Sequence, residues 1–79
     1  MKRILLMGLG AKATAAGVRS WLGGFGPVLD VHLVRDGDAE SPLAVVEMDI
    51  TDGQAFLLES RISNYWHDGA LVNARLLPY

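Results

Sequence analysis

Six segments of contrasting hydrophobic periodicity follow one another along the chain, and their order restricts the fold more than any other feature. Apolar or alternating runs occupy residues 2–9, 28–34, 42–50 and 70–77. Such runs favour strands, because a strand directs successive side chains to opposite faces. Residues 14–25 and 51–65 have apolar positions three and four apart, as helices do. The predicted order is therefore β-α-β-β-α-β.

Capping signals mark both predicted helices. Thr14 and Thr51 each precede a helical segment, and Gln54 completes a capping box with Thr51. Ala55, Leu58, Ile62 and Tyr65 share one face of the second helix, so we expect that helix to continue to Tyr65 and to be closed by residues 66–69.

This order of elements predicts an α+β fold in which two helices cover one face of a sheet. Right-handed crossovers in both β-α-β units give the ferredoxin-like arrangement, a two-layer sandwich with an antiparallel four-stranded sheet of order 4-1-3-2. The sequence has no internal repeat or linker, and we expect a single domain over residues 1–79.

Residues 7–13, MGLGAKA, fit two loose motifs as well as a simple loop. Gly8, Gly10 and Ala13 match a dinucleotide-binding fingerprint, with Asp30 at the expected distance. However, Asp30 begins its strand, and the chain is too short for a doubly wound sheet. A signal peptide would need an uninterrupted apolar core, and its removal would delete the first strand. The segment is therefore interpreted as a strand end and a loop that leads into a helix.

Composition excludes several classes of function. The 79 residues include no cysteine, which rules out disulfides and thiolate metal sites and fits a reducing compartment, so we expect a cytoplasmic protein. No apolar run approaches the roughly 20 residues of a membrane span. The net charge of −2 provides no overall basic footprint for nucleic acid. Hydrophobic residues make up 51% of the chain, enough to leave apolar surface for a partner.

The chain resembles the RNA-recognition motif (RRM) family along almost its whole length. Ile4–Leu9 occupies the place of the first-strand hexamer of the family, and Ser41–Met48 that of the third-strand octamer. Val18–Val28 matches the end of the first helix of the family. Ala55 and Gly69 match small residues of the second helix and of the turn before the last strand.

This resemblance implies an RNA-binding sheet, but the residues that would bind RNA differ. In the family, aromatic side chains on the two central strands stack on bases. The equivalent residues here are Leu5, Leu43 and Val45, and Ser41 and Pro42 replace a basic residue and a glycine. Since each stacked base contributes roughly 1–3 kcal/mol, losing these aromatics removes most of the expected affinity for RNA.

Strand alternation predicts an open sheet face with an apolar stripe and a polar rim. The residues on this face are Leu5, Met7, His32, Val34, Leu43, Val45, Asn73 and Arg75. Exposed apolar surface of this kind marks interfaces, although Tyr79 could instead fold back over the stripe. Phe56 and Leu57, which lie off the core face of the second helix, form a second candidate contact.

Two hypotheses follow. The first is a non-enzymatic protein-interaction or self-association module that uses the aliphatic sheet face. The alternative is a weak or atypical binder of single-stranded RNA that uses Arg3, His32, Arg75 and loops. The sequence offers no catalytic constellation. His32 and His67 lack the spacing of metal ligands. We therefore expect no metal, no small-molecule cofactor and no membrane partner.

Overall fold

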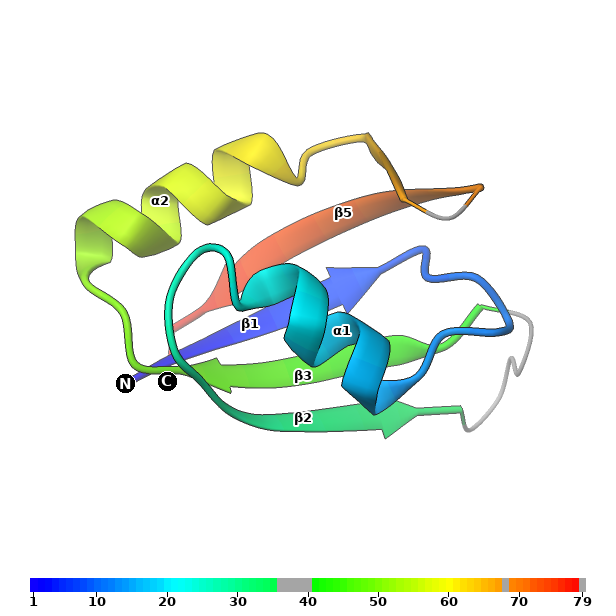
Figure 1. Ribbon diagram of the computed structural model, residues 1–79. Helices are drawn as coiled ribbons and strands as arrows, with labels where there is room; N and C mark the ends of the chain where they lie inside the picture. Colours follow the sequence, from blue (N-terminus) through cyan, green and yellow to red (C-terminus); the bar gives the residue numbers. More distant parts are fainter. Residues whose placement is uncertain (36–40, 68, 79) are drawn as a thin grey trace.

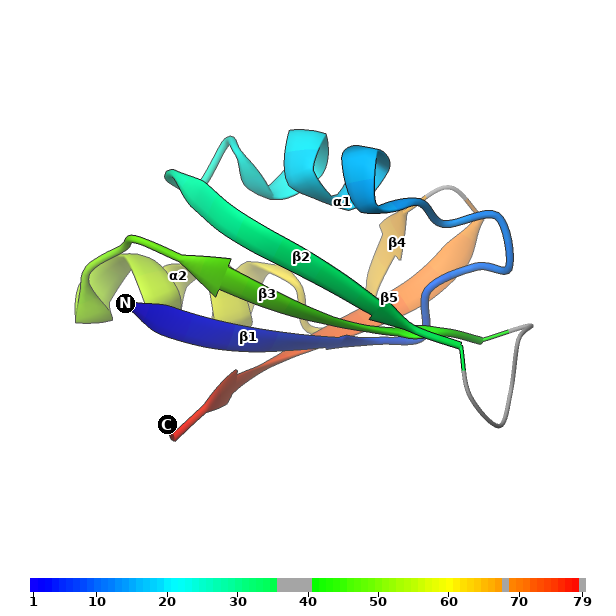
Figure 2. The ribbon, with the colours of Figure 1, turned by 90° about the horizontal axis from the view of Figure 1, so that it is seen from below.

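The computed structural model describes residues 1–35, 41–67 and 69–78, and over these residues it contains two helices and five strands (Figure 1). In chain order they are β1 (Lys2–Met7), α1 (Ala15–Leu22), β2 (Val28–Val34), β3 (Leu43–Met48), α2 (Asp52–Arg61), β4 (Tyr65–His67) and β5 (Ala70–Leu77). Both helices lie on the same face of the sheet, as Figures 1 and 2 show together. The α+β ferredoxin-like prediction is confirmed.

The predicted number of strands is wrong. The described residues form a five-stranded antiparallel sheet of order β2-β3-β1-β5-β4, not a four-stranded one. The four longer strands keep the predicted neighbours, with β5 in the place expected for the last strand. The additional strand, β4, pairs with the start of β5: Tyr65 lies opposite Val72, Trp66 opposite Leu71, and His67 opposite Ala70.

Strand β4 arises because α2 ends earlier than predicted. The helix ends at Arg61, and Asn64 has a positive φ of 55°, which turns the chain back towards the sheet. A single asparagine tolerates this left-handed conformation. Tyr65 therefore belongs to a strand, and the prediction that residues 66–69 close the helix is wrong. Residue 68 lies outside the described part of the chain, and so does Tyr79, on which the alternative of a covered stripe depends.

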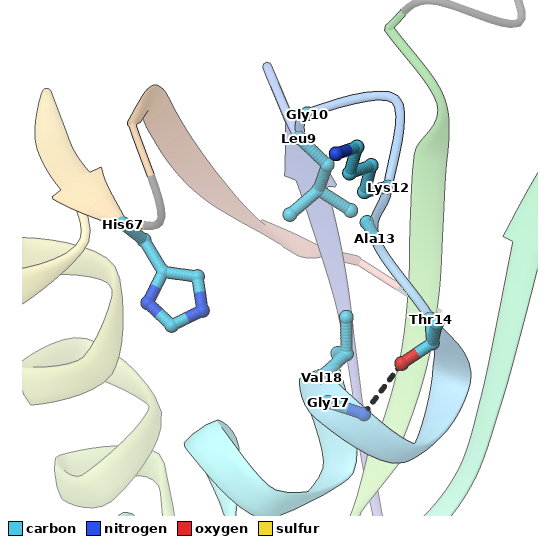
Figure 3. Close-up of a pocket in the computed structure, with 8 residues that line it drawn as sticks. All are labelled: Leu9, Gly10, Lys12, Ala13, Thr14, Gly17, Val18 and His67. Carbon is cyan, nitrogen blue, oxygen red and sulfur yellow. Dashed lines mark hydrogen bonds between the residues drawn. The ribbon is translucent and has the colours of Figure 1, made fainter.

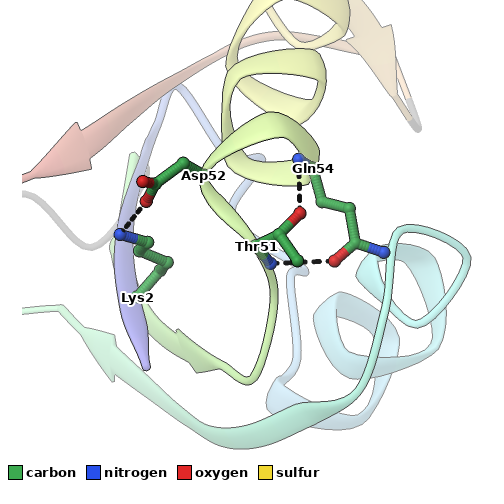
Figure 4. Close-up of polar contacts among 4 residues, drawn as sticks. All are labelled: Lys2, Thr51, Asp52 and Gln54. Atoms are coloured by element: carbon green, nitrogen blue, oxygen red, sulfur yellow. Dashed lines mark hydrogen bonds and ion pairs between the residues drawn. The ribbon is translucent and has the colours of Figure 1, made fainter.

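Side-chain caps begin both helices as predicted. Thr14 Oγ1 accepts a hydrogen bond from the Gly17 amide at 3.0 Å. In α2, Thr51 Oγ1 accepts from the Gln54 amide at 3.1 Å, and Gln54 Oε1 accepts from the Thr51 amide at 2.9 Å (Figure 4). This reciprocal box satisfies amides that have no partner within the helix. Asp52 follows the cap and forms an ion pair with Lys2 of β1.

The core lies between the helices and the sheet. Its buried members are Ile4, Leu6, Leu9, Val18, Leu22, Ala44, Val46, Met48, Ile50, Ala55, Leu58, Ile62, Val72 and Ala74. Val31 and Leu33 pack against this cluster, but Leu29, which precedes Val31 by two residues in the same strand, is 51% exposed. The β2–β3 register shifts between Val28 and Asp30, so Val28 takes the inward position and Leu29 is displaced.

Helix α2 covers the outer edge of β5 beyond the part paired with β4. The Ala74 amide donates to the Ile62 carbonyl at 3.0 Å. The Leu76 amide donates to Glu59 Oε2 at 2.7 Å. Two donors that point away from β1 are thus satisfied by the helix and the turn that follows it. This protects the edge from pairing with another strand.

Neither helix in the described ranges has the length and apolar composition that a bilayer span requires. The same residues contain no group of three side chains suited to holding a metal ion.

Candidate functional site

The face of the sheet opposite the helices carries the predicted site residues. Strand alternation sends Ile4, Leu6, Ala44 and Val46 into the core. Their neighbours along β1 and β3 therefore point to the open face, which Figure 2 shows to be free of helices. Leu5, Met7 and Val45 are half-buried there, and Leu43 is exposed. The sheet surface is consequently covered by close-packed aliphatic groups that water still reaches.

Strand register arranges the open face in three rows that cross β2, β3, β1 and β5. The middle row is His32, Val45, Leu5 and Arg75. The row nearest the start of β1 is Asp30, Glu47, Arg3 and Leu77. In the third row Val34 pairs with Leu43, and Met7 pairs with Asn73. In the middle and third rows the positions on β1 and β3 are aliphatic, and polar groups stand at the outer ends of the middle row.

A charge pair lies at the end of the aliphatic patch. Arg3 Nε lies 3.3 Å from Glu47 Oε1, across the β1–β3 pair, and both side chains keep contact with solvent. Asp30 stands beside Glu47 in the same row. Two carboxylates therefore offset one guanidinium at this end of the face, and a polyanion gains little from it.

Asn73 has a structural role that sequence reasoning missed. Its Oδ1 accepts a hydrogen bond from the Asn64 amide at 3.0 Å. This bond joins β5 to the turn that leads into β4, where Asn64 has its positive φ. Asn73 lies on the open face as predicted, but its carbonyl oxygen is already used to hold that turn.

Trp66 is an exposed aromatic side chain of β4 that the sequence analysis assigned to the end of a helix. It pairs with Leu71 of β5, and the two side chains are 67% and 44% exposed. Cross-strand partners point to the same side of a sheet, so Trp66 stands on the side of Leu71 and not on the core side. No periodicity signal could have shown this, because the strand has only three residues.

The other two residues of β4 face the helix layer and stack against α1. The ring centroids of Trp21 and His67 lie 3.8 Å apart with nearly parallel planes, and those of Trp21 and Tyr65 lie 5.9 Å apart. In Figure 2, β4 rises from the sheet towards α1. The aromatic stack therefore holds β4 to the first helix.

The glycine-rich segment after β1 lines a small cavity, shown in Figure 3. Its volume is about 120 Å³, and its walls come from the loop, the start of α1 and His67 of β4. Ligand pockets usually measure about 300–1,000 Å³, so a dinucleotide does not fit. Gly8 has φ +84° and a Cβ there would meet the Leu71 carbonyl oxygen at 2.2 Å, so this glycine is required by packing.

The second candidate contact lies on the exterior of α2. Phe56 and Leu57 are 71% and 48% exposed, while Ala55 and Leu58 on either side of them are buried. The two side chains leave the helix about 100° apart and do not merge with the open face of the sheet. They remain a separate apolar site on the helix layer.

Comparison with solved structures identifies the fold. The RNA-binding protein PG1 superposes with a TM-score of 0.84 at 14% identity, over all of this chain and 96% of that one. The third RRM of Pes4 gives 0.84 at 15% identity, over 100% and 94% of the two chains. The RRM of Rna15 with bound RNA gives 0.79 at 11% identity, over 98% and 83%. The chain therefore has a divergent RRM-like fold.

No protein-family model matches the sequence. No curated protein matches it either. The resemblance is thus one of fold.

Proposed function

We propose that this chain is a non-enzymatic interaction module that binds a protein surface through its aliphatic sheet face. The middle row carries this proposal, because Val45 and Leu5 stand side by side on the two central strands. Proteins of this fold that bind RNA use aromatic rings on those strands for stacking on bases. Aliphatic side chains lack a π surface, but they favour burial against other apolar groups.

The composition of the face supports a protein partner. Its centre is aliphatic, and His32, Arg75, Arg3 and Glu47 stand around it. An apolar centre with a polar rim is the usual arrangement of a protein–protein interface. The Rna15 domain was solved with RNA, so RNA is the competing partner that a test has to exclude.

The first test is a titration of labelled protein with a degenerate pool of short single-stranded RNA at low ionic strength. We expect no amide shifts that cluster on Leu5, Val45 and Arg75. Clustered shifts that weaken steeply with salt would overturn the proposal, since phosphate contacts release counterions. The alternative of atypical RNA binding would then hold.

A substitution on the face tests the protein interface directly. Val45→Glu places a charge at the centre of the patch and should weaken partner binding at least tenfold, about 1.4 kcal/mol. Leu57→Glu makes the same kind of change on α2 and should leave binding intact. Sedimentation equilibrium of the parent and both variants at protein concentrations up to about 1 mM, at ionic strengths of about 0.1 and 1 M, measures self-association. Capture from cell extract at the same ionic strengths measures binding of another protein.

The expected result is association, with a second copy or with another protein, by the parent and by Leu57→Glu at both salt concentrations, and its loss from Val45→Glu. Apolar burial does not weaken as salt rises, whereas exposed charge pairs do. Equal retention by all three proteins would place the interface elsewhere and contradict the proposal. Amide spectra of both variants verify that they are folded.

A further inference from the structure

The three rows of the open face form a pattern that is complementary to itself. Arg3 and Glu47 occupy equivalent places on β1 and β3, and so do Leu5 and Val45. We propose that the occupant of this face is a second copy of the chain, in a dimer whose two-fold axis runs parallel to the strands between β1 and β3. This inference rests on the proposed protein-binding function and names its partner.

Such an axis exchanges β1 with β3, and β2 with β5. Leu5 of one copy then faces Val45 of the second copy, and Met7 faces Leu43. Arg3 faces Glu47 of the second copy, so the pair already joined at 3.3 Å within each chain becomes a cluster of four alternating charges. Every central position meets a chemically matching one, as an isologous interface requires.

A second possible two-fold axis lies between the two sheets and runs perpendicular to the strands. The positions of Arg3 and Glu47 exclude a dimer about that axis. It would place each strand against the same strand of the second copy and reverse the order of the rows. Glu47 would then face Leu43 of the second copy, and Arg3 would face Met7. Both charges would be buried against apolar groups without a new partner, which is costly. On the central strands β1 and β3, only the axis parallel to the strands places charge on charge and aliphatic on aliphatic; at the rim Asp30 faces Leu77 and Val34 faces Asn73.

The open-face residues of the outer strands, β2 and β5, remain a solvated rim. His32 faces Arg75 of the second copy there, with Asp30 two residues away on β2, and both His32 and Arg75 are exposed. Aligned sheets pack at an angle of about 30°, which leaves positions near the axis in register and displaces the rim. The central pairs therefore determine the dimer.

The size of the face predicts a weak dimer. Four strands and three rows cover roughly 19 by 20 Å, so about 400 Å² of flat sheet is hidden on each copy. This area lies below the roughly 800 Å² per partner of a standard stable interface. Association should therefore be a rapid equilibrium, visible only at protein concentrations in the high micromolar range or above.

Complementary charge reversals test the register. Arg3→Glu places a carboxylate opposite Glu47 of the second copy, and Glu47→Arg places a guanidinium opposite Arg3. Each variant alone should therefore associate at least tenfold more weakly than the parent. In a mixture of the two variants, every facing pair is again of opposite charge, so the mixture should form a heterodimer at the parental affinity. Sedimentation equilibrium, and amide shifts of labelled Arg3→Glu upon addition of unlabelled Glu47→Arg, measure this.

Each outcome is decisive. Heterodimer formation by two variants that are monomeric alone supports the proposed axis. A parent that is monomeric up to about 1 mM overturns the dimer, while salt-resistant capture sensitive to Val45→Glu would still uphold the proposed function. A dimeric parent whose single reversals stay dimeric, or whose mixed variants fail to associate, overturns this register. Amide spectra of each variant verify its fold before the comparison.

Discussion

Gly8 determines where β1 leaves the sheet. Gly8 has a positive φ, and a Cβ there would overlap the Leu71 carbonyl oxygen at 2.2 Å, whereas a Cβ on Gly69 would meet nothing within 4 Å. Gly8→Ala should therefore lower the free energy of unfolding by about 2–3 kcal/mol through both backbone and packing terms. Gly69→Ala, with φ +78°, should lose only about 1 kcal/mol.

Denaturant unfolding of the two variants separates these terms. Gly69→Ala measures the backbone cost alone, and the excess loss in Gly8→Ala measures the close approach of β1 and β5. Equal losses would mean that Leu71 moves aside without cost, contrary to the packing role assigned to Gly8.

A second residue-scale prediction concerns pH. The Lys2 ammonium hydrogen-bonds to Asp52 and attracts its charge, which lowers the pKa of that carboxyl below its ordinary value of 3.8. A lowered pKa in the folded state means that ionised Asp52 stabilises the fold above the unfolded-state pKa. This contribution is lost as pH falls through the folded-state pKa. It is small, because the pair is exposed.

Asp52→Asn and Lys2→Gln should each remove this pH-dependent contribution, and the double variant should show no further loss. Unfolding midpoints measured from neutral pH to below 3.8 provide the test. The difference between the parent and Asp52→Asn should shrink as the solution is acidified. A difference that grows on acidification would contradict the assigned pair.

At the scale of elements, β4 depends on an aromatic stack as well as on its pairing with β5. Trp21 lies against both His67 and Tyr65, and an aromatic contact contributes about 0.5–1.5 kcal/mol beyond burial. Trp21→Ala should therefore lower hydrogen-exchange protection of the β4 amides about tenfold or more relative to those of β1 and β3. Trp21→Phe should retain most of the protection. A uniform loss over all strands would show that Trp21 supports only global stability.

The elements also show what sequence patterns can and cannot predict. Both helix starts are predictable, because a side-chain cap is a local signal carried by Thr14, Thr51 and Gln54. The end of α2 is not, because Tyr65 continues the helical spacing of Ile62 while Asn64 turns the chain away. The displacement of Leu29 is also hidden, because a bulge leaves simple alternation in the sequence unchanged.

At the scale of the whole molecule, the fold class and the neighbours of the four longer strands follow from the order of periodicities. Alternation also indicates which residues share the open face. Their arrangement in rows could not be predicted, because register depends on turns and bulges that bring distant strands together. The pairing of Arg3 with Glu47 across β1 and β3, on which the dimer proposal depends, is therefore known only from the structure.

The covered edge of β5 has a consequence for how far assembly can proceed. Fibres grow when every molecule offers two open strand edges, one to accept a neighbour and one to be accepted. Here Glu59 and the Ile62 carbonyl occupy donors on one side, and β4 adds only three residues there. Addition of strands at β2 therefore ends after two molecules. Edge-to-edge strand addition alone therefore favours pairs of molecules over fibres.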